Sequence, residues 1–554
     1  MINHGQNARL GMLCGADKLA DTVAVTLGPM GRNVLIDMDG DKPPCSTKNG
    51  ARIADSLSNS DPVEQVGLRL VRRASQRIKE DLGDGATTTI VLARALVFYG
   101  IQALLAGMEP RRLSLLLEEG ISVVIGEIRR MARRIDGQRD YENVAAIAAN
   151  GEADLGRIVV EAYNRVGVNG IVSVERSQAN TSSVAEVIGI NWEGGYISPY
   201  FMTDPTTTVC DYENSLILLY EQPLDRHEAI LKPLELAKKI RRPLLIVAET
   251  VKGEALRFLT LNKIHNGVPV VAGKAPFFGD RRRQKLEDVA ALTGAQVISP
   301  QFGESQKSID TKALGSAKKI QLTKNKTTIL GGGRKGDRIT RRIQGIRAQL
   351  RGKNLTPYDQ CFLEERLATL TGGMAMIQIG GNGEVEIRER VERAESAVKS
   401  VILARKSGVV PGGGTAYIQA SNVLPISHVT EKRIVFELLR KALSEPTRRI
   451  ALNGGYDGTV IAARLREIKK DPFIGFDGRS GEICDLYRTG VLDPAEIVIA
   501  ALQAAASVAS LFLMTEVVVA KDKVIPRPTR SNDIPFGPKA KDMTAEEAGS
   551  FGLL

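Results

Sequence analysis

A short segment rich in glycine and threonine is the strongest candidate for chemistry in this sequence. Residues Gly83–Thr89 read GDGATTT and lie between two stretches with helical periodicity. Small residues let a backbone approach an anion closely, and the start of the following helix offers free N–H groups. The threonine hydroxyls add donors, and the carboxylate of Asp84 suits the Mg²⁺ that accompanies a nucleotide triphosphate. A capped helix after a tight turn would use the same residues, so the segment alone leaves both interpretations open.

Two further glycine-bearing turns strengthen the phosphate interpretation. Thr26–Asn33 (TLGPMGRN) follows an amphipathic helical pattern, and Gly408–Gly414 (GVVPGGG) precedes another. The chain contains no GxxxxGK(S/T) sequence, which excludes a Walker A loop. Each turn is a weak signal by itself. Their combination favours phosphate binding over a simple capped turn.

The composition is that of an ordinary globular protein with an excess of positive charge. Its 554 residues are 43% hydrophobic and 25% charged, and a chain of this length usually divides into several domains. The net charge of +11 would attract nucleic acid, anionic membranes or acidic proteins. The basic residues form short scattered clusters such as Arg129–Arg130, which favours solvated helix faces over a nucleic-acid groove. An aromatic content of 5% also disfavours a stacking surface for single strands.

Several classes of protein are disfavoured by other features of the sequence. The five cysteines and four histidines are dispersed without zinc-ligand spacing, and isolated thiols favour a reducing intracellular compartment. Residues Met1–Leu10 show no secretory signal pattern. Ile497–Met514 is apolar over the length that spans a bilayer, but its many alanines gain little from lipid. We therefore predict a buried helix there and no membrane span.

The elements that must position the glycine turns are mostly helical. Asp61–Glu64 (DPVE) combines an N-cap, a proline at the first helical position and an acidic first turn. Apolar residues from Val63 to Ile78 then recur at three- and four-residue steps, and Gly83 ends the pattern. Similar patterns predict further helices at about residues 87–105, 110–134, 384–406, 431–452 and 496–514.

The middle of the chain has a different pattern. Pro243–Ala248 and Val268–Ala272 are short apolar runs bounded by proline or glycine, which is typical of buried strands. Helical patterns at Ile230–Ile240 and Gly253–Lys263 alternate with these runs. The alternation predicts an α/β module inserted into a mainly helical framework.

The motifs together resemble those of the group I chaperonins, the GroEL family. The blocks that carry the resemblance occur in the family's order: TLGPMGRN (26–33), GDGATTT (83–89), GYISPYF (195–201), KAPFFGDRR (274–282), GVVPGGG (408–414) and GVLDP (490–494). They extend over nearly the whole chain, from about residue 3 to 520. The chain resembles a divergent paralogue, because other residues occupy two acidic positions of the family pattern.

The resemblance implies a multidomain α/β fold with a mainly helical equatorial domain, a small intermediate hinge domain and an α/β apical domain inserted in the middle of the chain. The implied boundaries are 1–130 and 407–521 for the equatorial nucleotide-binding domain, 131–187 and 375–406 for the intermediate domain, 188–374 for the apical client-binding domain, and 522–554 for a flexible C-terminal tail. This division agrees with the inserted α/β module that the residue patterns predict.

The resemblance also implies which residues contact ATP. These are Thr26, Leu27, Gly28, Pro29, Lys48, Asp84, Gly85, Ala86, Thr87, Thr88, Gly413, Asp477, Gly478, Arg479 and Asp493. Asp84 is the implied ligand of Mg²⁺. The segment 477–479 departs from the family's usual sequence at the place where the family contacts the base.

Two of the three acidic groups that the family places around the γ-phosphate are replaced. The family has one acid in a TKDG loop and one in a helix resembling RVEDAL, whereas this chain has Asn49 in TKNG and Ser396 in RAESAV. A carboxylate that orients or deprotonates water is worth about 10²–10⁴ in rate, so we expect severely slowed hydrolysis and assign no catalytic residue. Glu395 adjoins Ser396 but points about 100° away on a helix, which makes it the weaker alternative. Restoring aspartate at both positions is expected to raise turnover.

The surface that would hold clients is likewise implied by the resemblance. It consists of side chains on a groove that captures non-native polypeptides and a lid-like co-chaperonin: Tyr196, Tyr200, Phe201, Leu231, Leu234, Leu256, Thr260 and Leu261. Without the resemblance, the same spacing would indicate ordinary core packing. Lys232 and Lys252 add positive charge beside this groove, and the basic chain predicts a less negative chamber than the family's.

The sequence therefore predicts a subunit of a homo-oligomeric chaperonin ring, in the ATPase and isomerase class of folding machines, with impaired hydrolysis. We expect ATP and Mg²⁺ as cofactors, a single or double seven-membered ring and no membrane partner. We expect a bacterial cytoplasm, with an organelle matrix as the alternative location. Two other functions stay open. One is a nucleotide-binding scaffold or holdase without productive cycling, and the other is a basic nucleic-acid-binding protein, which the composition disfavours.

Overall fold

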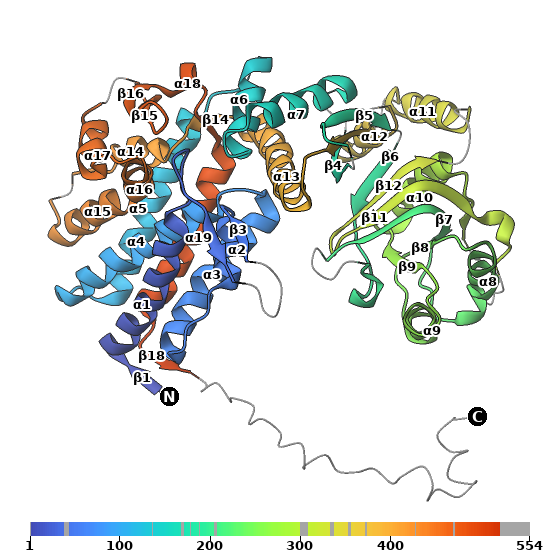
Figure 1. The fold of residues 1–554 in the computed structure, drawn as a ribbon, viewed down its shortest axis with the longest axis horizontal. Helices are drawn as coiled ribbons and strands as arrows, with labels where there is room; N and C mark the ends of the chain where they lie inside the picture. The colour runs from blue at the N-terminus through green and yellow to red at the C-terminus, as the bar shows by residue number, and fades with distance from the viewer. Residues whose placement is uncertain are drawn as a thin grey trace, which may run out of the picture.

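The computed structural model describes most of the chain. The described residues are 2–37, 44–135, 137–167, 171–177, 179–187, 189–203, 208–299, 309–332, 337–352, 356–371, 374–426, 428–468 and 471–520. The predicted tail, 522–554, lies outside them. Elements from the two ends of the chain lie side by side in one part of the molecule, and the middle of the chain forms a separate α/β unit (Figure 1).

The two ends of the chain form a mainly helical unit, here called the helical body. Its N-terminal helices are α1 (Gly5–Ala24), α2 (Gly50–Ser56), α3 (Pro62–Leu82), α4 (Ala86–Leu105) and α5 (Pro110–Met131). Its C-terminal helices are α14 (Thr415–Ser421), α15 (Thr430–Leu443), α16 (Glu445–Asn453), α17 (Gly458–Glu467), α18 (Leu486–Thr489) and α19 (Ala495–Met514). Its strand pairs are β1 (Ile2–His4) with β18 (Val517–Val519), β2 (Val34–Ile36) with β3 (Cys45–Thr47), β14 (Val409–Pro411) with β17 (Leu492–Pro494), and β15 (Ile474–Asp477) with β16 (Glu482–Asp485).

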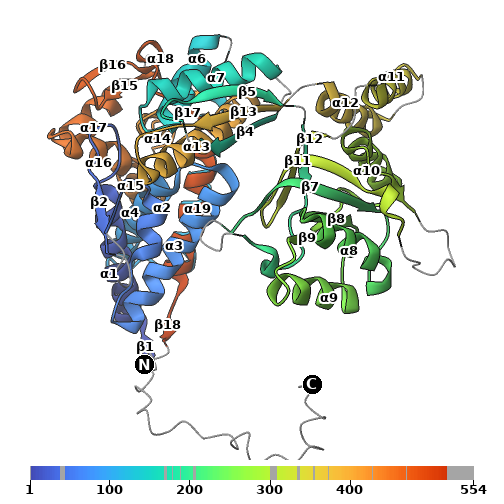
Figure 2. The same ribbon diagram turned by 45° about the vertical axis from the view of Figure 1, so that its right-hand side comes forward.

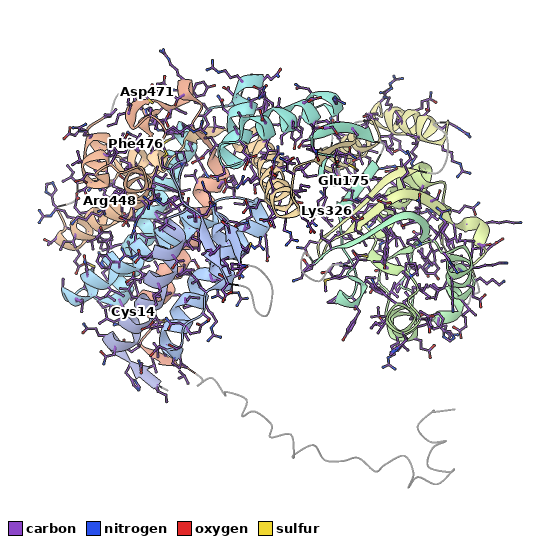
Figure 3. The ribbon with its side chains drawn as sticks, in the orientation of Figure 1. Cys14, Glu175, Lys326, Arg448, Asp471 and Phe476 are labelled. Atoms are coloured by element: carbon purple, nitrogen blue, oxygen red, sulfur yellow. The ribbon has the colours of Figure 1, made fainter. Side chains whose placement is uncertain are left out.

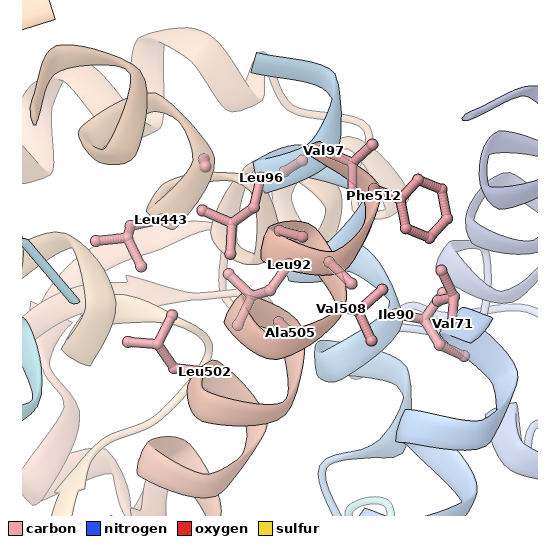
Figure 4. Close-up of a cluster of buried hydrophobic side chains, with 14 of the residues drawn as sticks. Val71, Ile90, Leu92, Leu96, Val97, Leu443, Leu502, Ala505, Val508 and Phe512 are labelled. Carbon is pink, nitrogen blue, oxygen red and sulfur yellow. The ribbon is translucent and has the colours of Figure 1, made fainter. Parts of the chain in front are cut away.

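The centre of the helical body is formed by α4 and α19. Leu92 and Leu96 of α4 belong to the same buried cluster as Leu502 and Val508 of α19 (Figure 4). By length and composition, both helices are apolar enough to cross a membrane. However, 61% and 56% of their apolar stretches are buried within the protein, which is typical of core helices and agrees with the buried helix predicted at 497–514.

The start and the end of α3 follow from its flanking residues, as the sequence predicts. Oδ1 of Asp61 accepts hydrogen bonds from the backbone N–H groups of Val63 (2.8 Å) and Glu64 (3.0 Å). At the other end, Gly83 adopts a left-handed conformation with φ of +82°, which costs glycine little. This ending leads directly into the GDGATTT segment and sets it at the N-terminus of α4.

Other predicted helices are confirmed to within a few residues, with one difference. The helix predicted at 431–452 is two helices, α15 and α16, which meet at Ser444. Pro446 lies in the first turn of α16, where the missing N–H group of proline breaks no helical hydrogen bond. Inside one continuous helix the same proline would remove a bond and clash with the preceding turn.

A smaller unit, here called the middle layer, lies between the helical body and the rest of the chain (Figure 2). Its helices are α6 (Gln138–Ala148), α7 (Ala153–Val166) and α13 (Glu384–Ser407), and its sheet has the order β4 (Ile171–Arg176), β13 (Met374–Ile379), β5 (Ser183–Val187). β13 runs parallel to β4 and antiparallel to β5. Val159 of α7 and Val401 of α13 share one buried cluster, so two distant segments again build one core.

The middle of the chain forms a third unit, here called the sheet module. Its sheet has the order β6–β12–β11–β7–β8–β9, with β10 paired to β7. The strands are β6 (Gly189–Glu193), β7 (Cys210–Tyr220), β8 (Leu244–Ala248), β9 (Val270–Lys274), β10 (Val297–Ile298), β11 (Gly315–Leu322) and β12 (Lys326–Gly332). The helices are α8 (Leu231–Ile240), α9 (Gly253–Ile264), α10 (Gly279–Thr293), α11 (Asp337–Leu350) and α12 (Pro357–Thr371), with 3₁₀ turns at Pro199–Phe201, His227–Ala229 and Thr311–Ala313.

The sheet module combines two kinds of strand pairing. β7, β8 and β9 are parallel and are connected through α8 and α9, as the alternating patterns predict. β6, β12, β11 and β7 are antiparallel neighbours. The predicted fold class is therefore confirmed, because a mainly helical unit and a small middle unit carry an α/β unit inserted between the two halves of the chain.

A charged cluster joins the sheet module to the middle layer. Nζ of Lys319 in β11 donates a hydrogen bond to Oε2 of Glu175 in β4 (2.6 Å) and lies 3.2 Å from Oδ2 of Asp211 in β7. The side chains of Lys319 and Glu175 are only 20% and 21% exposed. Figure 3 shows Glu175 and, from β12, Lys326 at this junction. A half-buried ionic contact thus fastens the two units here.

Candidate nucleotide site and apolar surface

The residues predicted to contact ATP lie around one cavity. It has a volume of about 300 Å³ and lies between the helical body and α13 of the middle layer. The whole predicted set lines it: Thr26, Leu27, Gly28, Pro29, Lys48, Asp84, Gly85, Ala86, Thr87, Thr88, Gly413, Asp477, Gly478, Arg479 and Asp493. Asn49 and Ser396 also line it. Segments from both ends of the chain and from α13 thus meet at one place.

The GDGATTT segment presents the start of α4 to the cavity. Gly85, the N-cap of α4, has a φ of +89° and no side chain to cap the helix, which leaves the first N–H groups of α4 for a ligand. Gly50, at the start of α2, comes so close that a Cβ there would lie 2.1 Å from Oγ1 of Thr87. The uncapped N-terminus of α4 therefore forms a positively polarised cradle that suits phosphate, with the glycine backbone packed closely beside it.

Two carboxyl groups lie close together at the wall of this cradle. Burial raises the pKa of Asp84, and the positive charge of Lys79 partly offsets this effect. Burial, together with the charge of Asp84, raises the pKa of Asp493 to about 7. Oδ1 of Asp84 accepts a hydrogen bond from the N–H group of Gly85 (2.7 Å). Two carboxyl groups that line one cavity and repel each other form a donor set that fits a divalent cation such as Mg²⁺.

Asn49 is held by hydrogen bonds at both ends of its amide group. Its Oδ1 caps α2 by accepting from the N–H groups of Ala51 (3.1 Å) and Arg52 (3.4 Å). Its Nδ2 donates to Oε2 of Glu392 in α13 (2.9 Å). The amide therefore connects the helical body to the middle layer, and it carries no charge with which to polarise water.

Ser396 is also engaged on both sides. It is 6% exposed, and its Oγ accepts a hydrogen bond from Nζ of Lys79 (2.8 Å) while donating to the carbonyl oxygen of Glu392 (2.9 Å). Lys79 donates in addition to the carbonyl oxygen of Gly83 (2.7 Å). A lysine amine thus lies beside the position where the GroEL family has a carboxylate, and it adds positive charge next to the phosphate cradle.

Glu392 is a cavity residue that the sequence reasoning missed. It lies four residues before Ser396, so both side chains are on the same face of α13, and both line the cavity. Glu395, the neighbour considered as a substitute, is exposed and is not among the cavity-lining residues. A search one helical turn away from the replaced position, instead of one residue away, would have found Glu392.

The segment 477–479 closes one end of the cavity. Oδ1 of Asp477 accepts a hydrogen bond from the N–H group of Arg479 (2.9 Å), so this carboxylate is used within its own turn. Gly478 lies against Pro29, where a Cβ would be 3.2 Å from Cγ of the proline ring. Phe476, which is labelled in Figure 3, packs edge-on against Tyr456 with ring centroids 5.6 Å apart behind this segment. The segment therefore offers backbone and a guanidinium group to the cavity.

The predicted client residues divide into an accessible and a buried group. The accessible group consists of the exposed Tyr200 (66%), Leu231 (39%) and Leu261 (54%) and the half-buried Tyr196, Leu256 and Thr260. Phe201 and Leu234 are only 0% and 4% exposed. The expectation that these two present a surface is therefore corrected, because both side chains belong to the core of the sheet module.

Further apolar side chains are exposed on α8 and α9. Ile240 at the end of α8 and Ile264 at the end of α9 are 43% and 53% exposed. Lys232 and Lys252 are exposed on the same two helices, or directly before them, as expected. We call the accessible group the apolar surface of α8 and α9. Exposed apolar groups of this kind mark sites of contact with other proteins.

The fold and the cavity define a class of protein in which a helical body with a glycine-lined cavity carries an inserted α/β module. A sequence model of the TCP-1/cpn60 chaperonin family matches residues 19–523. The chain belongs to this family, and membership supports a chaperone role in protein folding.

Solved structures share the same fold. The chain is similar to the chaperonin gp146 of the bacteriophage EL 2 (Pseudomonas aeruginosa), crystallised in the presence of ATP-BeFx. In crystal form II the TM-score is 0.68 at 22% identity, over 94% of this chain and 100% of that chain. In crystal form I it is 0.62 at 22% identity, over 94% and 99%.

Proposed function

We propose that the chain is an ATP-binding subunit of a ring-shaped chaperonin that holds non-native polypeptides and assists their refolding. The observation that carries the proposal is the meeting of the glycine turns with Lys48, Asp84 and Asp493 around one cavity. Family membership supports the chaperone role. In this proposal the helical body (1–130 and 407–521) is the equatorial domain, the middle layer (131–187 and 375–406) the hinge domain, and the sheet module (188–374) the apical domain.

Different groups around the cavity would bind the phosphates and the Mg²⁺ of Mg·ATP. The N-terminus of α4 and the hydroxyls of Thr87 and Thr88 would bind phosphate oxygens. Asp84, with Asp493 beside it, would hold Mg²⁺, which supplies positive charge to the phosphates when bound. Lys48 would add a second positive group, because it lines the same cavity.

Hydrolysis by this site would be slow. The amide of Asn49 and the hydroxyl of Ser396 stand where the family has carboxylates, and neither can accept a proton from water at neutral pH. Both are also engaged in hydrogen bonds within the protein. The binding groups are thus present while the usual acids are absent, which separates nucleotide binding from turnover.

The apolar surface of α8 and α9 is the proposed contact for clients. Hydrophobic contact is non-directional, so such a surface accepts many unfolded segments. The exposed Lys232 and Lys252 would favour acidic over basic clients. The same surface is the proposed contact for a lid-like co-chaperonin, in a ring of seven subunits, single or double, in a bacterial cytoplasm.

A holdase or scaffold without productive cycling is the second candidate function. The hydrogen bond from Asn49 to Glu392 favours it, because this bond ties the loop before α2 to α13. A site fixed in this way could bind nucleotide as a structural ligand. The two candidates differ in whether a bound client is released when ATP is added.

A refolding experiment with the purified full chain tests the proposal. ATP affinity would be measured by titration calorimetry, and ring formation by electron microscopy of the same sample. We expect nucleotide binding, rings, suppression of client aggregation and slow ATP-dependent release. Client binding with no effect of ATP would favour the holdase, and a protein that binds neither nucleotide nor client would overturn both functions. Affinity for nucleic acid that falls steeply with salt would favour the third function.

A further inference from the structure

Glu392 is one of two acidic residues of α13 that line the cavity, and the other, Glu389, is paired with Arg393. Glu392 lines the cavity with Ser396 and Asn49, and its Oε2 lies 2.9 Å from Nδ2 of Asn49. The ion pairs of α13 in the described part of the chain use Glu384 and Glu389 and do not include Glu392. Its carboxylate therefore keeps a free lone pair beside the neutral amide.

The geometry of Asn49 determines which atom of its amide meets Glu392. Its Oδ1 is committed to the N–H groups of Ala51 and Arg52, so the NH₂ end must point to α13. An aspartate at residue 49 would put a second carboxylate about 3 Å from that of Glu392, and two carboxylates so close cannot both stay ionised. Asparagine at residue 49 avoids this repulsion and donates a hydrogen bond to Glu392 instead.

We propose that Glu392 is the catalytic carboxylate of this site and that the acid has moved from the loop before α2 to α13. In the reaction, the oxygen of a water molecule bonds to the γ-phosphorus of ATP while the bond from that phosphorus to the β,γ-bridging oxygen breaks. ADP leaves with the electron pair of that bond. The carboxylate of Glu392 accepts the proton of the water and later releases it to solvent, and the NH₂ group of Asn49 orients the carboxylate. This inference rests on the proposed binding of ATP in the cavity.

The test compares three variants of the full chain with the wild type in two separate measurements. Nucleotide affinity is measured by calorimetry, and the rate of a single turnover by phosphate release with enzyme in excess. We expect Glu392→Gln to lower the rate about 10²-fold with an affinity within twofold of the wild type, because glutamine keeps the size and loses the base. Glu392→Asp should keep part of the rate. The control Glu384→Gln, at an exposed position on the same helix, should leave both measurements unchanged.

A double variant keeps the inference testable if Glu392→Gln alone is unstable. Asn49→Asp with Glu392→Gln returns the acid to the loop, so it should hydrolyse faster than Glu392→Gln alone, whereas Asn49→Asp alone should be slower than the wild type. Wild-type turnover in Glu392→Gln, or a wild type with no measurable turnover, would overturn the role of Glu392 and leave ATP binding standing. No ATP binding by the wild type would instead overturn the proposed function.

Discussion

At the scale of single residues, the charged side chains around the proposed γ-phosphate lie in other positions than in the family pattern. Lys79 donates to Ser396 where the family has a carboxylate, and Glu392 brings a carboxylate from one turn earlier on the same helix. Asn49 is the neutral residue that donates a hydrogen bond to the carboxylate of Glu392. The cavity therefore has a positive and a negative side chain in positions that differ from the family's. The effect of each on hydrolysis can be measured by mutating it separately.

Ser396→Asp is expected to raise the rate of phosphate release about 10-fold or more, because a carboxylate there could accept a proton from water. Nζ of Lys79, which lies 2.8 Å from Oγ of the serine, would keep the new acid ionised. Single-turnover phosphate release measures the effect. Asparagine has the size of aspartate without its charge. Equal rates in Ser396→Asp and Ser396→Asn would therefore show that the charge at this position does not matter.

Asp84→Asn is expected to remove the dependence of nucleotide binding on Mg²⁺. In the wild type, the close acids Asp84 and Asp493 should make affinity at least about 10-fold higher with Mg²⁺ than with a chelator, because the cation cancels their repulsion. In the variant the two affinities should differ by less than about twofold. Calorimetry in both buffers measures this ratio, and an unchanged ratio would place the cation elsewhere.

The residues predicted to contact ATP do line the cavity, but the presence of Glu392 there could not be predicted from the sequence. The glycine turns and Asp84 are recognisable by their residue types and by their order along the chain. All the residues predicted to contact ATP line the cavity. Glu392 has no such signal, because a helix lets residues four apart reach the same point and a linear motif aligns only one of them. The burial of Phe201 and Leu234 was missed for a related reason, since the same spacing suits a core or a surface.

At the scale of elements, α13 links the cavity to the rest of the molecule. Its Glu392 and Ser396 face the cavity, while Val401 packs in the core of the middle layer. The sheet of the middle layer in turn meets β11 through Glu175 and Lys319. A displacement of α13 upon nucleotide binding would therefore be transmitted to the sheet module.

Lys319→Met is expected to loosen the contact between β4 and β11. The change leaves Glu175 and Asp211 without their shared cation, and the loss of such a partly exposed contact costs about 1 kcal/mol. Hydrogen exchange should become faster in both strands. Lys318→Met is the matched control, because the neighbouring side chain is exposed. Equal exchange in the two variants would contradict a fastening role for Lys319.

A helix or strand could be predicted where the residues at its ends, or its apolar pattern, distinguish it from a loop. The cap at Asp61 and the glycine at residue 83 defined α3 to the residue. The apolar runs of β8 and β9 revealed the parallel strands. The antiparallel strands β11 and β12 mix charged, polar and apolar residues, as in GSAKKIQL, so their pattern does not stand out from that of a loop.

At the scale of the whole molecule, the excess of positive charge extends to the sheet module. Asp359 is the acid retained where the family pattern often has more. Its Oδ1 lies 2.7 Å from Nη2 of Arg281, which offsets its charge. With a net charge of +11, a ring of such subunits would have a less negative interior than the family's. Acidic clients would gain most from such an interior.

Replacing Leu231 and Leu261 together by serine is expected to reduce the suppression of client aggregation severalfold. Both side chains are exposed on the apolar surface of α8 and α9, so the change removes contact area without opening a core. Light scattering of a denatured client, with and without the chaperonin, measures the effect. Ile426→Ser is the control, because this side chain is 86% exposed and belongs to the connection between α14 and α15, two helices on the opposite side of the molecule from α8 and α9 (Figure 1). Equal losses in both proteins would contradict the assignment of the surface.

The pairing of Ile2 with Val519 has a consequence for synthesis on the ribosome. The helices α1 to α5 emerge first, yet their core needs α19, which is made last. The sheet module and the middle layer have clusters of their own and can fold while translation continues. Until α19 arrives, the part of α4 that packs against α19 stays uncovered and is exposed to aggregation. The nascent subunit would therefore itself need protection from aggregation before it could protect any other chain.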